Sequence, residues 1–155
     1  MNLSPHFTLD EAIVSETAGR AGINNTPDAA MLEELKKTAA FMEQVRTVLD
    51  SKPILVTSWY RCDALERKVA GLSPIQVSRG HHPLGAAVDF HCPGFGSPFE
   101  VASHLSKHVD ALRIGQLIYE FGRWIHISRL PVPRPEFNRV ITIASGTGAR
   151  TGIIA

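Results

Sequence analysis

The chain has 155 residues, of which 44% are hydrophobic and 20% charged, a length and composition typical of one soluble globular domain and not of a disordered chain. Its 16 basic and 15 acidic residues give a net charge of +1, which excludes the strongly basic surface that binds nucleic acid, so no nucleic-acid partner is expected. The longest apolar runs are far too short to cross a bilayer, so no membrane insertion is expected.

The N-terminus and the cysteines indicate a protein that is cytoplasmic as synthesised. The first ten residues contain neither a basic segment nor an apolar run, so no secretory signal peptide is predicted. Cys62 and Cys92 are too few for a disulfide scaffold and lack the clustered spacing of a cysteine-rich zinc site. They are interpreted as free thiols in a reducing compartment.

The N-terminal part of the chain is predicted to be helical. Thr8 and Glu11 form a capping box, which is typical of a short helix and here predicts one that runs to Ala18. Thr26 followed by Pro27 indicates the N-cap and first position of the main core helix. The apolar residues of that helix recur at helical spacing: Leu32, Leu35, Ala39, Met42, Val45 and Leu49.

The middle of the chain is predicted to hold two strands and two short helices. The strands cover residues 54–58 and 86–91, which are rich in β-branched and apolar side chains. One helix is predicted over 63–69, ahead of a terminating glycine. The other is predicted over 97–112 and begins with a Ser-x-x-Glu capping box.

The last third is predicted to be rich in β-structure. Strands are expected over residues 116–121, 124–128 and 139–144, with a proline-rich loop before the last one. Residues 146–155 are expected to form a flexible C-terminal tail, which leaves 1–145 as a single domain. Because helices come mainly first and strands mainly last, the order favours an α+β fold with a small antiparallel sheet packed against the N-terminal helices.

One segment combines metal-binding residue types with a strand. SRGHHPLGAAVDFH, residues 78–91, places imidazoles and a carboxylate around a glycine turn that leads into the second strand. Side chains alternate along a strand, so Val88 and Phe90 are expected to face the core and Asp89 the opposite side. The glycine permits a sharp turn, which allows His82 to fold back toward Asp89.

The WIHIS segment, residues 124–128, alternates in the same way. Its two isoleucines are expected to face the core, and His126 is expected to be presented on the other face and not buried. Two imidazoles and one carboxylate from adjacent strands are the ligand set of a catalytic zinc site, which keeps its fourth position for water. On spacing alone, ordinary hydrogen-bonded histidines remain the alternative.

The pattern of these residues resembles a known family. His82, Gly85, Ala87 and Asp89 reproduce the HxxGxAxD motif of the zinc D-Ala-D-Ala carboxypeptidases and related phage endolysin peptidases. TSWYR, before the motif, and QLIYEF, ahead of WIHIS, resemble further segments of that family, so that the resemblance covers about residues 4–128. It implies the hedgehog-like metallopeptidase fold.

The resemblance also implies an activity and roles for single residues. Zn²⁺ would be the cofactor, with His82, Asp89 and His126 as its ligands; Arg61 would bind a substrate carboxylate or carbonyl, and Glu120 would be the general base. The implied reaction is hydrolysis of a peptidoglycan stem peptide, by a D-Ala-D-Ala carboxypeptidase or an endolysin-type endopeptidase. Proteins of phage lysis or of the virion are the implied partners. The alternative is a non-catalytic or weakly active zinc-containing binding module, such as a phage tail component.

The position of Glu120 can be tested by geometry. Five residues separate Glu120 from His126. Direct cross-strand pairing of the two, over a three-residue turn at 122–124, is expected to place both side chains on one face of a hairpin.

The metal-binding segment departs from the family pattern at one position. Gly80 stands where the family commonly has a serine, two residues before the first histidine ligand, and Ser78 is a candidate replacement. Loss of that hydroxyl would lower metal affinity or activity without removing a ligand. His81 and His91 are alternative ligands, although the spacing to Asp89 favours His82.

Overall fold

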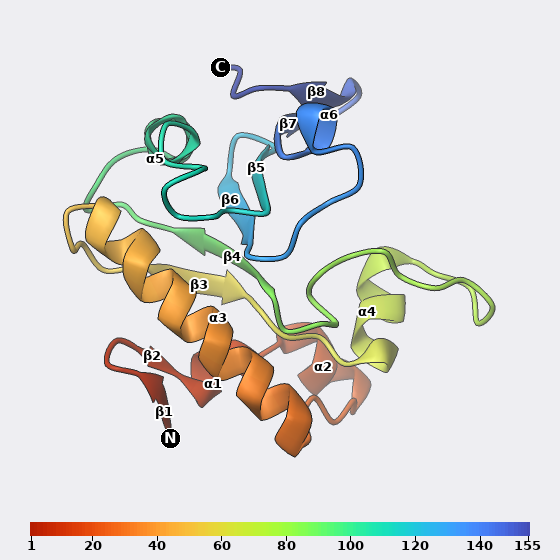
Figure 1. The fold of residues 1–155 in the computed structure, drawn as a ribbon. Helices are drawn as coiled ribbons and strands as arrows, with labels where there is room; N and C mark the ends of the chain where they lie inside the picture. The colour runs from red at the N-terminus through yellow and green to blue at the C-terminus, as the bar shows by residue number, and fades with distance from the viewer.

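Two sheets carry the strands of the protein, whose computed structural model describes residues 1–155 (Figure 1). The strands are β1 (Asn2–Ser4), β2 (Phe7–Thr8), β3 (Leu55–Ser58), β4 (Ala87–His91), β5 (Gln116–Glu120), β6 (Trp124–Ser128), β7 (Val140–Ala144) and β8 (Gly148–Thr151). The helices are α1 (Leu9–Ile13), α2 (Glu16–Ala21), α3 (Ala29–Val48), α4 (Asp63–Ala70), α5 (Pro98–Ser106) and α6 (Pro135–Asn138). None of these helices is both long and apolar enough to span a membrane.

The α+β class is confirmed, but the main sheet is larger than predicted and is mixed. Its six strands follow the order β3-β4-β6-β5-β7-β8, and the separate antiparallel pair β1–β2 forms a second sheet. All neighbours in the main sheet are antiparallel except β5 and β7. β6 ends beside the start of β5, and the loop that contains α6 carries the chain across to the other side of β5, so that β7 runs parallel to β5.

The hydrophobic core lies between the sheet and the long helix α3, with α5 beside it (Figure 1). The apolar stripe predicted for α3 is fully buried at Leu35, Ala39, Met42 and Val45. These side chains join Val88 and Phe90 of β4 and Ile125 and Ile127 of β6 in one cluster. One face of β4 and β6 is thus occupied by core packing, and their other side chains are left for a site.

The N-terminal helices differ from the prediction in where they begin and end. Thr8 and Glu11 form the predicted capping box, but α1 ends at Ile13, and a separate helix, α2, starts after Ser15, whose hydroxyl accepts the N–H of Ala18 at 3.2 Å. Helix α3 is capped by Asp28, whose carboxylate accepts the N–H of Met31 at 2.8 Å. Thr26 is not the cap, since the helix begins two residues later than predicted, and its N–H is bound by the side chain of Asn24 in a local turn.

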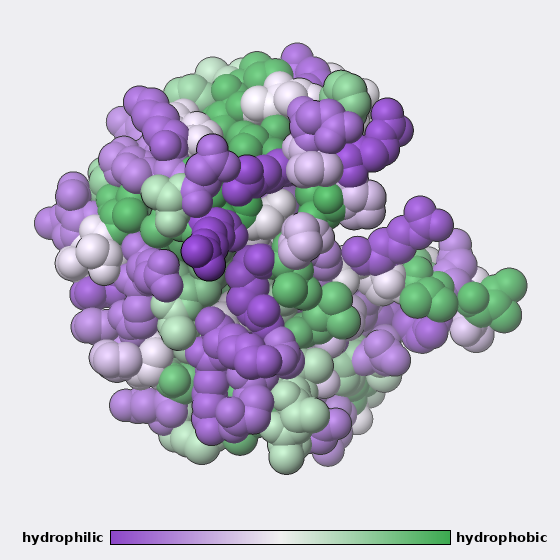
Figure 2. All heavy atoms as spheres, in the orientation of Figure 1, coloured by the Kyte–Doolittle hydropathy of each residue, from purple (hydrophilic) through white to green (hydrophobic).

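A projecting loop, residues 71–80, joins α4 to the metal-binding segment and is called the arm below (Figure 1). The side chain of Arg67 on α4 holds the arm by donating to the carbonyls of Ser73, Pro74 and Gln76. Figure 2 shows the surface hollowed between the arm and the part of the molecule that carries α6. The arm therefore forms one wall of an open cleft.

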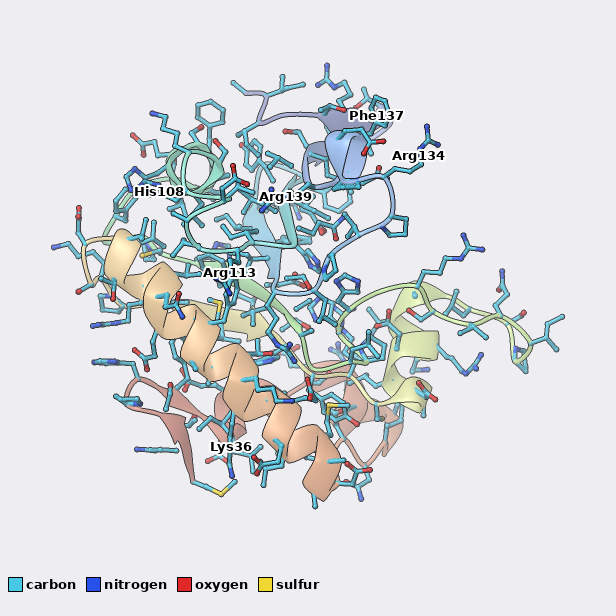
Figure 3. The ribbon with its side chains drawn as sticks, viewed as in Figure 1. Lys36, His108, Arg113, Arg134, Phe137 and Arg139 are labelled. Atoms are coloured by element: carbon cyan, nitrogen blue, oxygen red, sulfur yellow. The ribbon has the colours of Figure 1, made fainter.

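Helix α5 ends at Ser106, six residues before its predicted end at Leu112. The Ser97–Glu100 capping box is present as predicted. Beyond the helix, Arg139 donates to the carbonyls of Val109 and Ile114, at 3.0 and 2.8 Å, and holds the following turns (Figure 3). A side chain distant in the sequence thus stabilises the irregular turns that follow the helix.

Residues 146–155, predicted as a flexible tail, contribute a strand instead. β8 pairs antiparallel with β7, and the N–H of Gly152 donates to the carbonyl of Val140 at 2.8 Å. Gly146 and Gly148 have φ of +78° and +67°, a conformation that glycine adopts without steric cost. They allow a tight turn, and the chain therefore returns along β7 after it.

Candidate metal centre

The strand alternation predicted for the metal-binding face is confirmed. Asp89 of β4 lies directly opposite His126 of β6 in the antiparallel register. Their neighbours Val88, Phe90, Ile125 and Ile127 are fully buried in the core. Since opposite residues of an antiparallel pair share a face, Asp89 and His126 meet on the side of the sheet away from the core.

His82 reaches the same place through a glycine turn. Gly85, with φ of +66°, donates its N–H to the carbonyl of His82 at 3.0 Å, and a Cβ at this position would lie 2.8 Å from Sδ of Met31. The carbonyl of Gly85 accepts bonds from Trp59 Nε1 and Thr38 Oγ1. The turn is therefore anchored to both the end of β3 and helix α3, which fixes where His82 lies.

His82, Asp89 and His126 form one compact group. Their ligand atoms all lie within 4.8 Å of one another, and the residues are only 5, 8 and 8% exposed. The prediction that His126 would not be buried is wrong, because the ring of His82 packs edge-on against it with ring centroids 5.1 Å apart.

The hydrogen bonds of His82 orient one ring nitrogen toward Asp89. Nδ1 lies 2.6 Å from the carbonyl oxygen of Trp59, which can only accept, so Nδ1 carries the proton. The unprotonated Nε2 then faces Oδ2 of Asp89 at 3.3 Å. Two ligands of a tetrahedral zinc ion lie about 3.4 Å apart at ordinary bond lengths. Two acceptors that face each other at this distance fit a shared cation, and the donor set fits zinc.

The charge of Asp89 is stabilised by its neighbours. Burial would raise the pKa of Asp89, but the imidazoles of His126 and His82 beside it outweigh that effect and hold the pKa of this carboxyl well below its usual range. Nδ1 of His126 lies 2.8 Å from Oδ1. Asp89 is therefore a carboxylate at any pH at which the protein would act, as a metal ligand requires.

Glu120 lies on the metal-binding face, but the direct pairing predicted for it with His126 is wrong. The register opposes Glu120 to Trp124 and Ile118 to His126, because the loop spans residues 121–123. Glu120 still shares the face, since all four paired residues point to one side. Its Oε1 lies 4.0 Å from Nδ1 of His126.

The surroundings of Glu120 favour proton exchange. Burial raises the pKa of Glu120 above its usual value; His126 opposes this shift and Asp89 adds to it. The indole N–H of Trp124, directly opposite on β6, is buried and makes no hydrogen bond of ordinary geometry, but it lies close enough to the Glu120 carboxylate to lower its pKa.

Hydrogen bonds from all three guanidinium nitrogens hold Arg61 beside the metal-binding group. Nε donates to Ser58 Oγ at 3.2 Å, Nη1 to Glu66 at 3.1 Å and Nη2 to Asp89 at 3.4 Å. Glu66 was missed by sequence reasoning, because a glutamate within a short helix is ordinary. The structure shows it almost fully buried against Arg61.

The alternative histidine ligands lie outside the metal-binding group. Nδ1 of His81 is hydrogen-bonded to Oγ of Ser128 at 2.7 Å. Burial lowers the pKa of His81, and the imidazoles of His126 and His82 lower it further. His91 is at the far end of β4, opposite Leu55. The structure therefore brings together the three candidate ligands favoured by the spacing and leaves the two alternatives apart.

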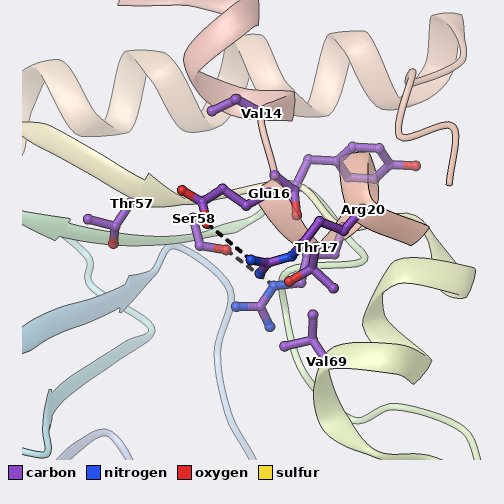
Figure 4. A pocket seen from close by; sticks show the side chains of 10 residues that line it. Val14, Glu16, Thr17, Arg20, Thr57, Ser58 and Val69 are labelled. Carbon is purple, nitrogen blue, oxygen red and sulfur yellow. Dashed lines mark hydrogen bonds and ion pairs between the residues drawn. The ribbon is translucent and has the colours of Figure 1, made fainter. Parts of the chain in front are cut away.

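Two open cavities flank the Arg61–Glu66 pair. One, of about 480 Å³, lies between the α1–α2 turn and the end of β3 and is lined by Arg61 and Arg20 (Figure 4). The other, of about 530 Å³, lies between α4, the arm and Pro133 and is lined by Glu66 and His81. The two cavities thus open beside the Arg61–Glu66 pair, and neither is lined by His82, Asp89 or His126 themselves.

A sheet that presents two buried histidines and an aspartate, beside a glutamate and an arginine, has the donor set of a zinc metallopeptidase. The sequence model of the Peptidase M15 family matches residues 5–128. The chain belongs to this family, the zinc D-Ala-D-Ala carboxypeptidase family, and the resemblance drawn from the HxxGxAxD motif is confirmed. No match was found among curated proteins.

Proposed function

We propose that the protein is a zinc-dependent peptidase that hydrolyses a peptide bond in the stem peptides of bacterial peptidoglycan. The observation that carries the proposal is the buried group of His82, Asp89 and His126, with Glu120 4.0 Å from His126 and Arg61 3.4 Å from Asp89. Family membership supports the peptidase chemistry. The peptidoglycan substrate is inferred from the resemblance to carboxypeptidases and endolysins.

Each residue of the site has one role in the proposed hydrolysis. His82, Asp89 and His126 would hold Zn²⁺, which when bound supplies a Lewis acid that brings the pKa of water to about 7. Glu120 accepts the proton of the attacking water on its carboxylate and later donates it to the leaving amine. Arg61, fixed by Glu66, offers its remaining N–H groups to a carboxylate or to the developing oxyanion.

The proposal has two forms that share one site. A carboxypeptidase would use Arg61 to bind the terminal carboxylate of the substrate, whereas an endopeptidase would bind peptide on both sides of the scissile bond. The two cavities beside the Arg61–Glu66 pair support the endopeptidase form. Association with phage lysis or virion proteins stays a prediction.

A weakly active binding module, such as a phage tail component, is the second candidate. The observation that favours it is Gly80, where the family commonly has a serine. Such a module would keep the zinc site and bind peptidoglycan without cleaving it.

Digestion of purified peptidoglycan separates these functions. The zinc-loaded protein is expected to release products that a His126→Ala variant does not release, with both followed by mass spectrometry and by assay of new amines. Free D-alanine would identify the carboxypeptidase, and new amines without D-alanine the endopeptidase. If the protein holds zinc and binds peptidoglycan but releases neither product, the binding module is the correct function.

Replacing Arg61 with alanine is expected to reduce turnover far more than zinc content. Arg61 is not among the proposed ligands, and its removal leaves both histidines bonded as before, so the bound zinc should stay close to one equivalent. Loss of a charge-assisted contact made in the transition state typically lowers kcat on the order of 10²-fold or more. Parallel measurement of kcat and zinc content tests this, with Arg20→Ala as the comparison in the same cavity. Equal loss of both quantities would assign Arg61 a structural role.

A further inference from the structure

Glu66 is a buried carboxylate that the mechanism above uses only through Arg61. It is 5% exposed, its Oε2 accepts from Arg61 Nη1 at 3.1 Å and its Oε1 accepts from Ser78 Oγ at 2.8 Å. A buried charge is costly unless it is paired and hydrogen-bonded. Both oxygens of Glu66 are satisfied, one by the substrate-binding arginine and the other by the segment that leads to His82.

Ser78 links the carboxylate of Glu66 to the metal-binding segment. Its Oγ accepts the N–H of Gly80 at 3.1 Å, which closes a tight turn just before His82. At the other end of the segment, the N–H of Arg61 points to the carbonyl of His82 at 3.4 Å. The short stretch from Ser78 to His82 is therefore tied at both ends to the unit formed by Arg61 and Glu66.

A side chain at position 80 would lie beside the same carboxylate that Ser78 binds. A Cβ built on Gly80 would lie 3.1 Å from Oε1 of Glu66 and 3.3 Å from Oγ of Ser78. A serine at position 80, as in the family pattern, would bring its hydroxyl to the same carboxylate. In this chain Ser78 and Glu66 already occupy that space, and a side chain at 80 would be crowded.

We propose that Ser78, held by Glu66, performs the task of the serine that the family commonly has at the position of Gly80, and that this hydrogen-bonded pair positions His82 for zinc. The inference rests on the proposed metal site. Ser78 and Glu66 act here as positioning residues, because they reach the metal-binding group only through the chain and through Arg61. The departure at Gly80 is therefore compensated and does not indicate a degenerate site.

Relocating the hydroxyl tests this inference directly. The affinity for zinc is measured by competition with a chromogenic chelator. The proteins compared are the parent, the single variant Ser78→Ala, and two double variants that combine Ser78→Ala with either Gly80→Ser or Gly80→Ala. Ser78→Ala is expected to weaken zinc binding about 10-fold, the lower end of the effect of residues that support a ligand. The double variant with serine is expected to recover most of the loss, and the one with alanine, which adds Cβ without a hydroxyl, none.

Controls separate positioning from general stability. Ser73→Ala, an exposed serine on the arm with no side-chain hydrogen bond of its own, is expected to bind zinc as the parent does. Thermal unfolding of the metal-free variants is recorded alongside. If Ser78→Ala unfolds, the zinc affinities of Ser78→Thr, which keeps a hydroxyl, and Ser78→Val, which lacks one, are compared instead. A merely structural serine would change unfolding without recovery by the hydroxyl at position 80.

Three outcomes would overturn the inference. The inference fails if Ser78→Ala binds zinc as tightly as Ser73→Ala does. It also fails if the two double variants bind zinc with equal affinity. A parent chain that binds no zinc would overturn it together with the metal site. Because the readout is metal affinity, a parent that binds zinc but cleaves no peptide would contradict the proposed function and leave this test intact.

Discussion

Substitution of Glu120 by glutamine is expected to lower kcat for peptidoglycan hydrolysis by roughly 10²- to 10⁴-fold, the usual contribution of a general acid–base residue. Glutamine keeps the shape and hydrogen-bonding reach of the side chain but cannot accept a proton. Glu120 is 4.0 Å from His126 and is not one of the three proposed ligands, so zinc affinity should change little. A large loss of rate with zinc retained is the expected result.

The measurement is product release from purified peptidoglycan, with zinc content determined on the same samples. Glu33→Gln, at an exposed glutamate of α3 that pairs only with Lys36, is the matched control and should keep the parent rate. Retention of most of the activity by Glu120→Gln would show that another group moves the proton. Loss of zinc together with activity would make Glu120 a ligand and not a base.

The second large effect is expected for Asp89→Asn, which should weaken zinc binding by more than about 100-fold, beyond the range of residues that only support a ligand. The amide replaces a charged oxygen that faces Nε2 of His82 at 3.3 Å and contacts His126 and Arg61. A site without this negative charge attracts a dication less strongly, and the amide also disturbs the hydrogen bond that orients His126. Hydrolysis should fall in proportion to bound zinc.

Zinc titration with a competing chelator measures this effect, and metal-free circular dichroism shows whether the variant folds. Asp110→Asn provides the control, because Asp110 is a highly exposed aspartate that pairs with Arg139 at the surface. If Asp89→Asn binds zinc as tightly as Asp110→Asn does, Asp89 is not a ligand. The metal site would then have to be sought elsewhere in the chain.

The part of the site that depends on local patterns could be predicted from the sequence. Alternation along β4 and β6 places Asp89 and His126 away from the core, and it needs no knowledge of the rest of the fold. The glycine turn before β4 likewise predicts that His82 folds back. These inferences use only the period of a strand and the freedom of glycine, both of which are encoded over a few residues.

The wrong predictions about the site are those that depend on contacts between residues distant in the sequence. The register of the β5–β6 hairpin is set by a loop at 121–123, and a shift of two residues moved Glu120 from opposite His126 to a diagonal position. Burial of His126 follows from the packing of His82 against it. Neither effect leaves a signal in the local sequence, because each depends on how separate segments meet.

The mixed sheet and the role of Glu66 were missed for the same reason. β7 joins β5 in parallel only because the loop with α6 crosses over, and β8 lies in the segment predicted to be a flexible tail. Glu66 has no distinguishing neighbours in the sequence, although its carboxylate joins Arg61 to Ser78. The hedgehog-like fold implied by the family resemblance stays a prediction beyond the α+β class.

Reconstitution with metal tests most directly whether His82, Asp89 and His126 form the working centre of the protein. The protein is stripped with a chelator and dialysed, and hydrolysis of purified peptidoglycan is recorded as zinc is added back. The rate is expected to be negligible without metal and to rise linearly until one equivalent of zinc is bound, with no such rise for His126→Ala. Full activity in the stripped protein, or the same recovery in His126→Ala, would contradict a metallopeptidase centred on these three residues.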